Sequence, residues 1–100
     1  MIIIEKNAGP KIPYEVTGKK IIFDDDLMLN LGKRQAEEPV HIDICYNTAH
    51  QLITGTQDAR AYVAEIDIPP IEYAEPEGDE APEPLPLDMD KVVLTLWAIE

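Results

Sequence analysis

Apolar and polar residues alternate with a period of two in two stretches of the chain, which indicates β-strands that bury one face. In residues 40–46 (VHIDICY), one face carries the apolar side chains of Val40, Ile42, Ile44 and Tyr46. In residues 62–68 (YVAEIDI), the alternation directs inward the side chains of Tyr62, Ala64, Ile66 and Ile68. We therefore predict two half-buried strands, with the intervening polar residues facing solvent or a second layer.

A hairpin and two terminal strands are also predicted. Residues 14–16 and 20–23 flank the turn 17–19, in which Gly18 can supply the positive φ that a tight turn needs. Residues 2–4 (III) and 92–99 (VVLTLWAI) are apolar on both faces. Strands of that kind are covered on both sides or pair at an interface. We expect the two terminal strands to be central strands or contact strands.

Two further segments fit more than one structure. Residues 27–31 (LMLNL) fit a strand, which we prefer, or one or two helical turns that end at Gly32. Residues 48–53 (TAHQLI) fit a helical turn or an irregular loop, and we predict no strand there.

Proline marks the end of the second alternating strand, because a proline cannot donate a hydrogen bond to a neighbouring strand. Residues 68–87 contain six of the nine prolines. We predict an acidic, proline-rich, solvated loop at about residues 74–88, within a single domain of residues 1–100. The fold class that follows is all-β, a small antiparallel sandwich or partly open barrel of about six to eight strands. The alternative is α+β, with one or two short helices on one face of the sheet.

The net charge of −12 is placed unevenly. Residues 1–37 hold six acidic and six basic side chains, whereas residues 38–100 hold fourteen acidic and two basic ones. A negative field of this kind repels phosphate backbones and anionic lipids, so we expect no nucleic acid and no membrane as partners. The chain shows no signal peptide and no apolar run of about 20 residues, and Cys45 is its single cysteine. These features predict a cytoplasmic protein.

Candidate chemistry is sparse. His41, Asp43 and Cys45 are spaced by two residues, so a strand would place them on one face, and His50 follows. Imidazole, carboxylate and thiolate are all zinc ligands, which makes these four residues a candidate metal site. The spacing matches no standard structural zinc site, and ordinary outward-facing polar residues are the alternative. A Cys-His nucleophile pair is disfavoured, because Cys45 has no glycine-rich turn or helix start beside it. We expect no cofactor and no enzymatic activity.

The apolar terminal strands offer the best candidate for a docking surface, comprising Ile2, Ile4, Val93, Trp97 and Ile99. We therefore expect a non-enzymatic protein–protein interaction or assembly module that binds a protein partner or itself. Small β domains of this kind suit multimeric assemblies, such as structural or accessory proteins of viruses or mobile elements. One alternative is an acidic inhibitor or nucleic-acid mimic that binds a basic protein. A second alternative is a metal- or thiol-dependent enzyme built around His41, Asp43 and Cys45.

Overall fold

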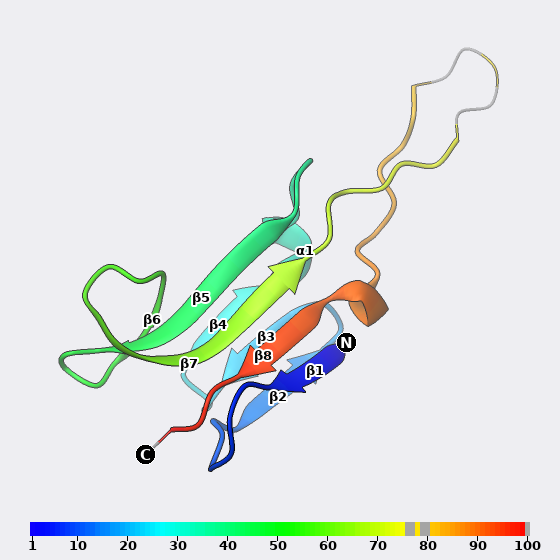
Figure 1. Cartoon of the computed structure of the whole chain (residues 1–100). Coiled ribbons are helices and arrows are strands. Elements are labelled where there is room, and N and C mark those ends of the chain that lie inside the picture. The colour runs from blue at the N-terminus through cyan, green and yellow to red at the C-terminus, as the bar shows by residue number, and fades with distance from the viewer. Residues whose placement is uncertain (76–77, 79–80, 100) are drawn as a thin grey trace.

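The computed structural model describes residues 1–75, 78 and 81–99, and the remaining residues of the predicted acidic loop, 76–77 and 79–80, lie outside the described residues. The chain forms two open β-sheets (Figure 1). The elements are β1 (Ile2–Glu5), β2 (Tyr14–Thr17), β3 (Lys20–Phe23), β4 (Leu27–Asn30), α1 (Leu31–Arg34), β5 (Val40–Asn47), β6 (Leu52–Thr54), β7 (Ala59–Ile68), the 3-10 turn η1 (Met89–Lys91) and β8 (Val93–Leu96). Among the described residues, no helix is long and apolar enough to cross a membrane.

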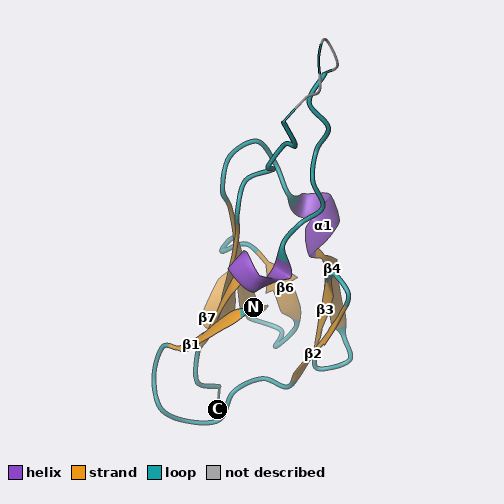
Figure 2. Ribbon diagram, turned by 90° about the vertical axis from the view of Figure 1, so that its right-hand side faces the viewer, coloured by secondary structure: helices purple, strands orange, loops and turns teal. Residues whose placement is uncertain are grey.

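The two sheets lie face to face as two layers (Figure 2). The larger sheet has the order β1-β8-β7-β5-β6, and the smaller has the order β2-β3-β4. All neighbouring strands are antiparallel except β1 and β8, which run parallel. The predicted all-β class is confirmed. The two sheets stay open, so the fold is a sandwich rather than a closed barrel.

The core fills the space between the two sheets. Most of its side chains come from the inward face of β3, β4, β5, β7 and β8, and the others come from α1 and the connecting segments. The core residues are Ile12, Ile21, Phe23, Leu29, Leu31, Ile42, Ile44, Val63, Ala64, Ile66, Ile68, Leu87, Val92, Leu94 and Leu96. Because side chains alternate along a strand, the residues between these face away from the core. On β5 and β7 those outward residues are mostly polar.

Several predicted elements are confirmed. Residues 14–17 and 20–23 pair as a hairpin, and Gly18 has a φ of +59° in its turn. Residues 27–30 form the preferred strand, β4, which pairs with β3. The chain then turns into α1, because the side chain of Asn30 accepts a hydrogen bond from the Lys33 amide and caps the helix. Gly32 lies inside this short helix rather than after it.

The prediction for residues 48–53 is wrong at its second half. Leu52 and Ile53 belong to β6, which pairs with β5 through Cys45 and Tyr46. The turn before β6 is held by Asn47, whose side-chain oxygen accepts hydrogen bonds from the amides of residues 49 and 51. This asparagine closes a tight β5–β6 turn, so the chain returns as a strand instead of winding into a helix.

The predicted inward orientation of Tyr62 is also wrong. The β5–β7 register shifts between Ile44 and Cys45, so that Ile44 pairs with Ala64 whereas Cys45 pairs with Tyr62. The extra residue on β7 is Val63, which is fully buried, while Tyr62 is 37% exposed. A β-bulge of this kind breaks the alternation of faces and places Tyr62 on the outer surface.

Beyond β7, the described residues of the proline-rich segment form a narrow ribbon that projects from the sandwich (Figure 1). Tyr73 and Pro84 form an antiparallel bridge, flanked by two backbone hydrogen bonds that join Ala74 to Glu83 and Leu85 to Glu72. The Tyr73 hydroxyl donates a hydrogen bond to Glu37 at the base of the ribbon. The described part of this segment is therefore paired as well as exposed.

Candidate functional site

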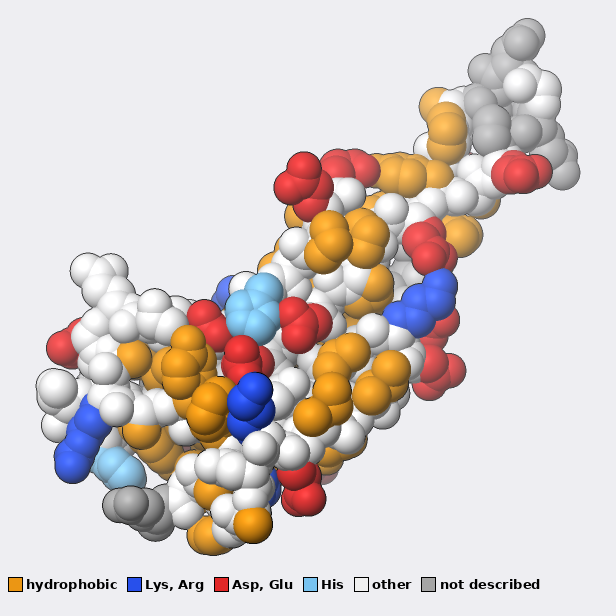
Figure 3. All heavy atoms as spheres, in the orientation of Figure 1, with side chains coloured by type: hydrophobic (Ala, Val, Ile, Leu, Met, Phe, Trp, Pro, Cys, Tyr) orange, Lys and Arg blue, Asp and Glu red, His pale blue; other side chains and the backbone are white. Residues whose placement is uncertain are grey.

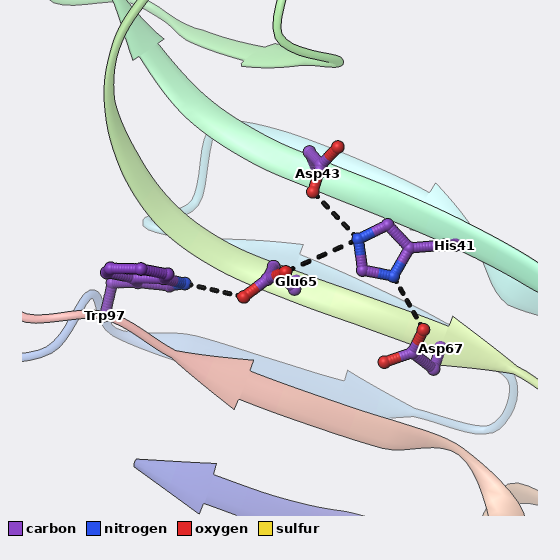
Figure 4. Close-up of polar contacts among 5 residues, drawn as sticks. All are labelled: His41, Asp43, Glu65, Asp67 and Trp97. Carbon is purple, nitrogen blue, oxygen red and sulfur yellow. Dashed lines mark hydrogen bonds and ion pairs between the residues drawn. The ribbon is translucent and has the colours of Figure 1, made fainter. Parts of the chain in front are cut away.

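A polar cluster lies on the outer face of the larger sheet, where β5 and β7 run side by side (Figure 4). The antiparallel register places His41 opposite Asp67, and Asp43 opposite Glu65. Residues directly opposite each other on two strands have neighbouring side chains. The four residues therefore form one compact group, which we call the His41 cluster.

Both ring nitrogens of His41 contact carboxylates. Nδ1 lies 2.6 Å from an oxygen of Asp67, and Nε2 lies 2.9 Å from Asp43 and 3.4 Å from Glu65. The hydrogen bond to Asp67 raises the pKa of His41 most; burial opposes this rise, and the contact with Asp43 adds to it. When both ring nitrogens carry protons, each can donate to a carboxylate, so the cluster favours the imidazolium form.

Trp97 holds Glu65 from the other side. Its indole Nε1 donates a hydrogen bond of 2.8 Å to Glu65, whose other oxygen faces His41 (Figure 4). The indole ring also stacks on Tyr62, with ring centroids 5.1 Å apart, and the ammonium of Lys6 lies 5.5 Å from its centroid. The bulge that exposes Tyr62 therefore helps to fix Trp97, and Trp97 fixes the Glu65 carboxylate.

The structure brings together two of the four predicted metal-site residues and separates the other two from them. Among the described residues, the potential ligand atoms that lie within 4.8 Å of one another belong to His41, Asp43 and Glu65. Cys45 is fully buried. Burial raises the pKa of its thiol most, and the negative charges of Asp43 and Glu65 raise it further. His50 stacks on Tyr46 at the β5–β6 turn, with ring centroids 4.2 Å apart.

Sequence reasoning missed Glu65 and Asp67. The signal was present, because both are the outward residues of the alternating stretch 62–68. Linking them to His41 requires knowledge that β5 pairs with β7, and in which register.

The second candidate surface is the outer edge of β1, which among the described residues pairs with β8 alone. Ile2, Ile3 and Ile4 are 50%, 43% and 46% exposed. The amide of Ile2 donates a hydrogen bond to the carbonyl of Val92, just before β8, and the amide of Lys6 donates to the carbonyl of Leu96 within β8. Because successive backbone amides of a strand point in opposite directions, those of Ile3 and Glu5 point away from β8. We call this strand, with its three isoleucines and outward amides, the β1 edge.

Apolar side chains continue from the β1 edge in two directions. β1 and β2 are edge strands on the same side of the sandwich, so the inner-face side chains of Tyr14 and Val16 are also left partly exposed (Figures 1 and 2). On the outer face, Val93 pairs with Ile2 and is partly buried. Figure 3 shows hydrophobic side chains gathered over β1 and β8, next to the acidic side chains that surround a histidine.

The other predicted docking residues lie elsewhere. Trp97 belongs with Glu65 and Tyr62, and Ile99 packs against the core while its amide donates to Pro10. Comparisons with protein-family models, curated proteins and solved structures give no match. Function must therefore be inferred from the His41 cluster and the β1 edge.

Proposed function

We propose that this domain is a non-enzymatic assembly module that docks through the β1 edge, and that the occupant is a second copy of the same chain. The observation that carries the proposal is the exposure of three consecutive isoleucines on an edge strand. Free strand edges with apolar side chains pair readily with other strands, and proteins usually block them with charges, prolines or short length. Within β1, Glu5 is the only charged residue.

Local charge does not oppose a second copy at the β1 edge. Residues 1–37, which supply β1 and all of the smaller sheet, carry equal numbers of acidic and basic side chains, whereas residues 38–100 carry the whole net charge of −12. Two copies that meet at β1 therefore bring their neutral parts together. In an antiparallel pairing that overlaps the isoleucines, Glu5 lies opposite the start of the partner strand rather than opposite the partner's Glu5. The resulting interface has the two-fold symmetry most common in protein dimers.

The expected dimer is weak. Burying a whole isoleucine side chain is worth about 1.5–3 kcal/mol, and Ile2, Ile3 and Ile4 are about half exposed. Covering all six isoleucines of a pair would therefore contribute roughly 4–9 kcal/mol, to which each new backbone hydrogen bond adds about 0.5–1.5 kcal/mol. Association costs about 4–15 kcal/mol, which offsets most of this gain, so we expect a dimer that forms only at high protein concentration.

Sedimentation equilibrium over about 10 µM to 1 mM tests the proposal, because a weak dimer becomes populated toward the upper end of this range of protein concentration. We expect a reversible monomer–dimer equilibrium that persists in high salt, because apolar docking is not screened. Ile4→Lys should weaken the dimer at least about tenfold, since it removes apolar contact and places a like charge in both copies at the interface.

Met28→Lys is the matched control. Met28 is 53% exposed and lies on β4, which is the edge of the smaller sheet farther from β2. It introduces the same charge and should leave the dimer unchanged. A strict monomer at the highest concentration contradicts the proposal. A dimer that dissolves in salt, or one that both variants weaken equally, also contradicts it.

A further inference from the structure

We propose that the His41 cluster binds one divalent transition-metal ion of the zinc class, with Nε2 of His41 and the carboxylates of Asp43 and Glu65 as its protein ligands. This site lies on the face of the larger sheet, and its existence does not depend on docking at the β1 edge. The inference rests on three features: the spacing of the ligand atoms, the way each ligand is held, and the local charge.

The spacing suits a metal ion. Nitrogen and oxygen ligands lie about 2.0–2.2 Å from zinc, so two ligands of the same ion are separated by about 3.0 Å at a right angle and about 3.4 Å at the tetrahedral angle. Nε2 of His41 lies 2.9 Å from Asp43 and 3.4 Å from Glu65. The three ligand atoms all lie within 4.8 Å of one another, so small side-chain movements would bring all three onto one ion.

Two of the ligands are already oriented by groups outside the coordination sphere. A metal-binding histidine usually donates its other ring N–H to a carboxylate, which fixes the tautomer and the ring plane. Here Nδ1 of His41 contacts Asp67 at 2.6 Å, which leaves Nε2 for the ion. Glu65 is held in a comparable way, because Trp97 donates a hydrogen bond of 2.8 Å to one carboxylate oxygen and leaves the other free to coordinate.

The charge of the cluster favours a dication. Three carboxylates surround one imidazole, and Nε2 lies 2.9 Å from Asp43 and 3.4 Å from Glu65. An ion on Nε2 takes the place of any proton there, that proton passes to solvent, and no oxidation or reduction is involved. The mixture of imidazole and carboxylate favours zinc over calcium or magnesium, which prefer oxygen ligands alone. The ligands are partly exposed, so water can fill the remaining positions.

The test uses the full chain without a histidine tag, stripped of metal with a chelator and titrated with Zn²⁺ up to about 1 mM in a calorimeter and a fluorimeter. We expect one ion per chain. Because Trp97 is the only tryptophan and contacts Glu65, its fluorescence should change over the same range of Zn²⁺. His41→Ala should weaken binding at least about tenfold, since it removes one of three ligands.

His50→Ala is the matched control, because His50 is the only other histidine and stacks on Tyr46 at the β5–β6 turn. It should bind zinc like the natural chain. Asp43→Asn provides a second ligand variant if His41→Ala does not fold, as judged by circular dichroism. In a measurement that needs no variant, Co²⁺ should broaden the NMR signals of His41 and the Trp97 indole before those of His50.

Three results would overturn the inference. The first is no stoichiometric binding at about 1 mM Zn²⁺. The second is binding that His50→Ala weakens as much as His41→Ala does. The third is binding that leaves the fluorescence of Trp97 unchanged, which would place the ion elsewhere on the chain.

Discussion

Replacing Gly9 by alanine should destabilise the domain by at least about 1 kcal/mol more than replacing Gly18 by alanine. Both glycines have a positive φ, +129° for Gly9 and +59° for Gly18. They differ in what a new side chain would meet. A Cβ at Gly9 would lie 2.9 Å from the Cβ of Ala98, whereas a Cβ at Gly18 would meet nothing within 4 Å.

The expected loss of stability for each variant is the sum of a backbone-strain cost and a steric cost. At Gly18 an alanine is forced into the left-handed region, which costs about 1–2 kcal/mol. At Gly9 the strain is about 1–3 kcal/mol, and overpacking against Ala98 adds about 1–3 kcal/mol. A domain of this size has a total stability of about 5–15 kcal/mol, so Gly9→Ala removes a large share of it.

A double variant isolates the steric part. Ala98→Gly removes the methyl group that the new Cβ would meet, so Gly9→Ala with Ala98→Gly should recover about 1–3 kcal/mol relative to the additive expectation. The strain at position 9 should remain. The measurement is urea unfolding at 25 °C, followed by circular dichroism and analysed by linear extrapolation. Equal losses for the two glycine variants, together with no coupling between positions 9 and 98, would refute the reasoning.

Two further predictions concern titration and reactivity. In metal-free protein, NMR titration should give His41 a pKa above its ordinary value of about 6.5, and Asp67→Asn should lower it, because Asp67 supplies the largest stabilisation of the imidazolium. Since the folded pKa is raised, this stabilisation is fully present below about pH 6.5 and is lost as the pH rises through the folded pKa. Asp67→Asn should therefore reduce the free energy of unfolding mainly below about pH 6.5 and have less effect above the folded pKa of His41. Cys45 should react with a disulfide reagent only as fast as the domain unfolds, because its thiol is fully buried and burial raises its pKa. A rapid reaction in native conditions, with Cys45→Ala as the blank, would contradict that expectation.

The strands could be predicted where the sequence alone determines the local structure. β5 and most of β7 follow from apolar residues at every second position, and the β2–β3 hairpin follows from a glycine between two apolar stretches. The bulge at Val63 could not be predicted, because an extra residue is defined only relative to the strand opposite. The strand β6 was missed because Leu52 and Ile53 form too short a stretch to show a period.

The candidate sites depend more strongly on pairing. His41 and Asp43 share one strand, so their common face follows from the alternation. Glu65 and Asp67 join them only through the β5–β7 register. The β1 edge depends on the pairing of Ile2 with Val93, two residues at opposite ends of the chain, and no local pattern specifies that partner.

The parallel pairing of β1 with β8 also determines how the domain would respond to mechanical force. A pull on the chain before β1 and after β8 acts in opposite directions along two strands that run the same way. The pair is then loaded in shear, so its hydrogen bonds must break together rather than one after another, as they would when a hairpin is unzipped. Traction along the chain would therefore meet its main resistance between β1 and β8, beside the three isoleucines.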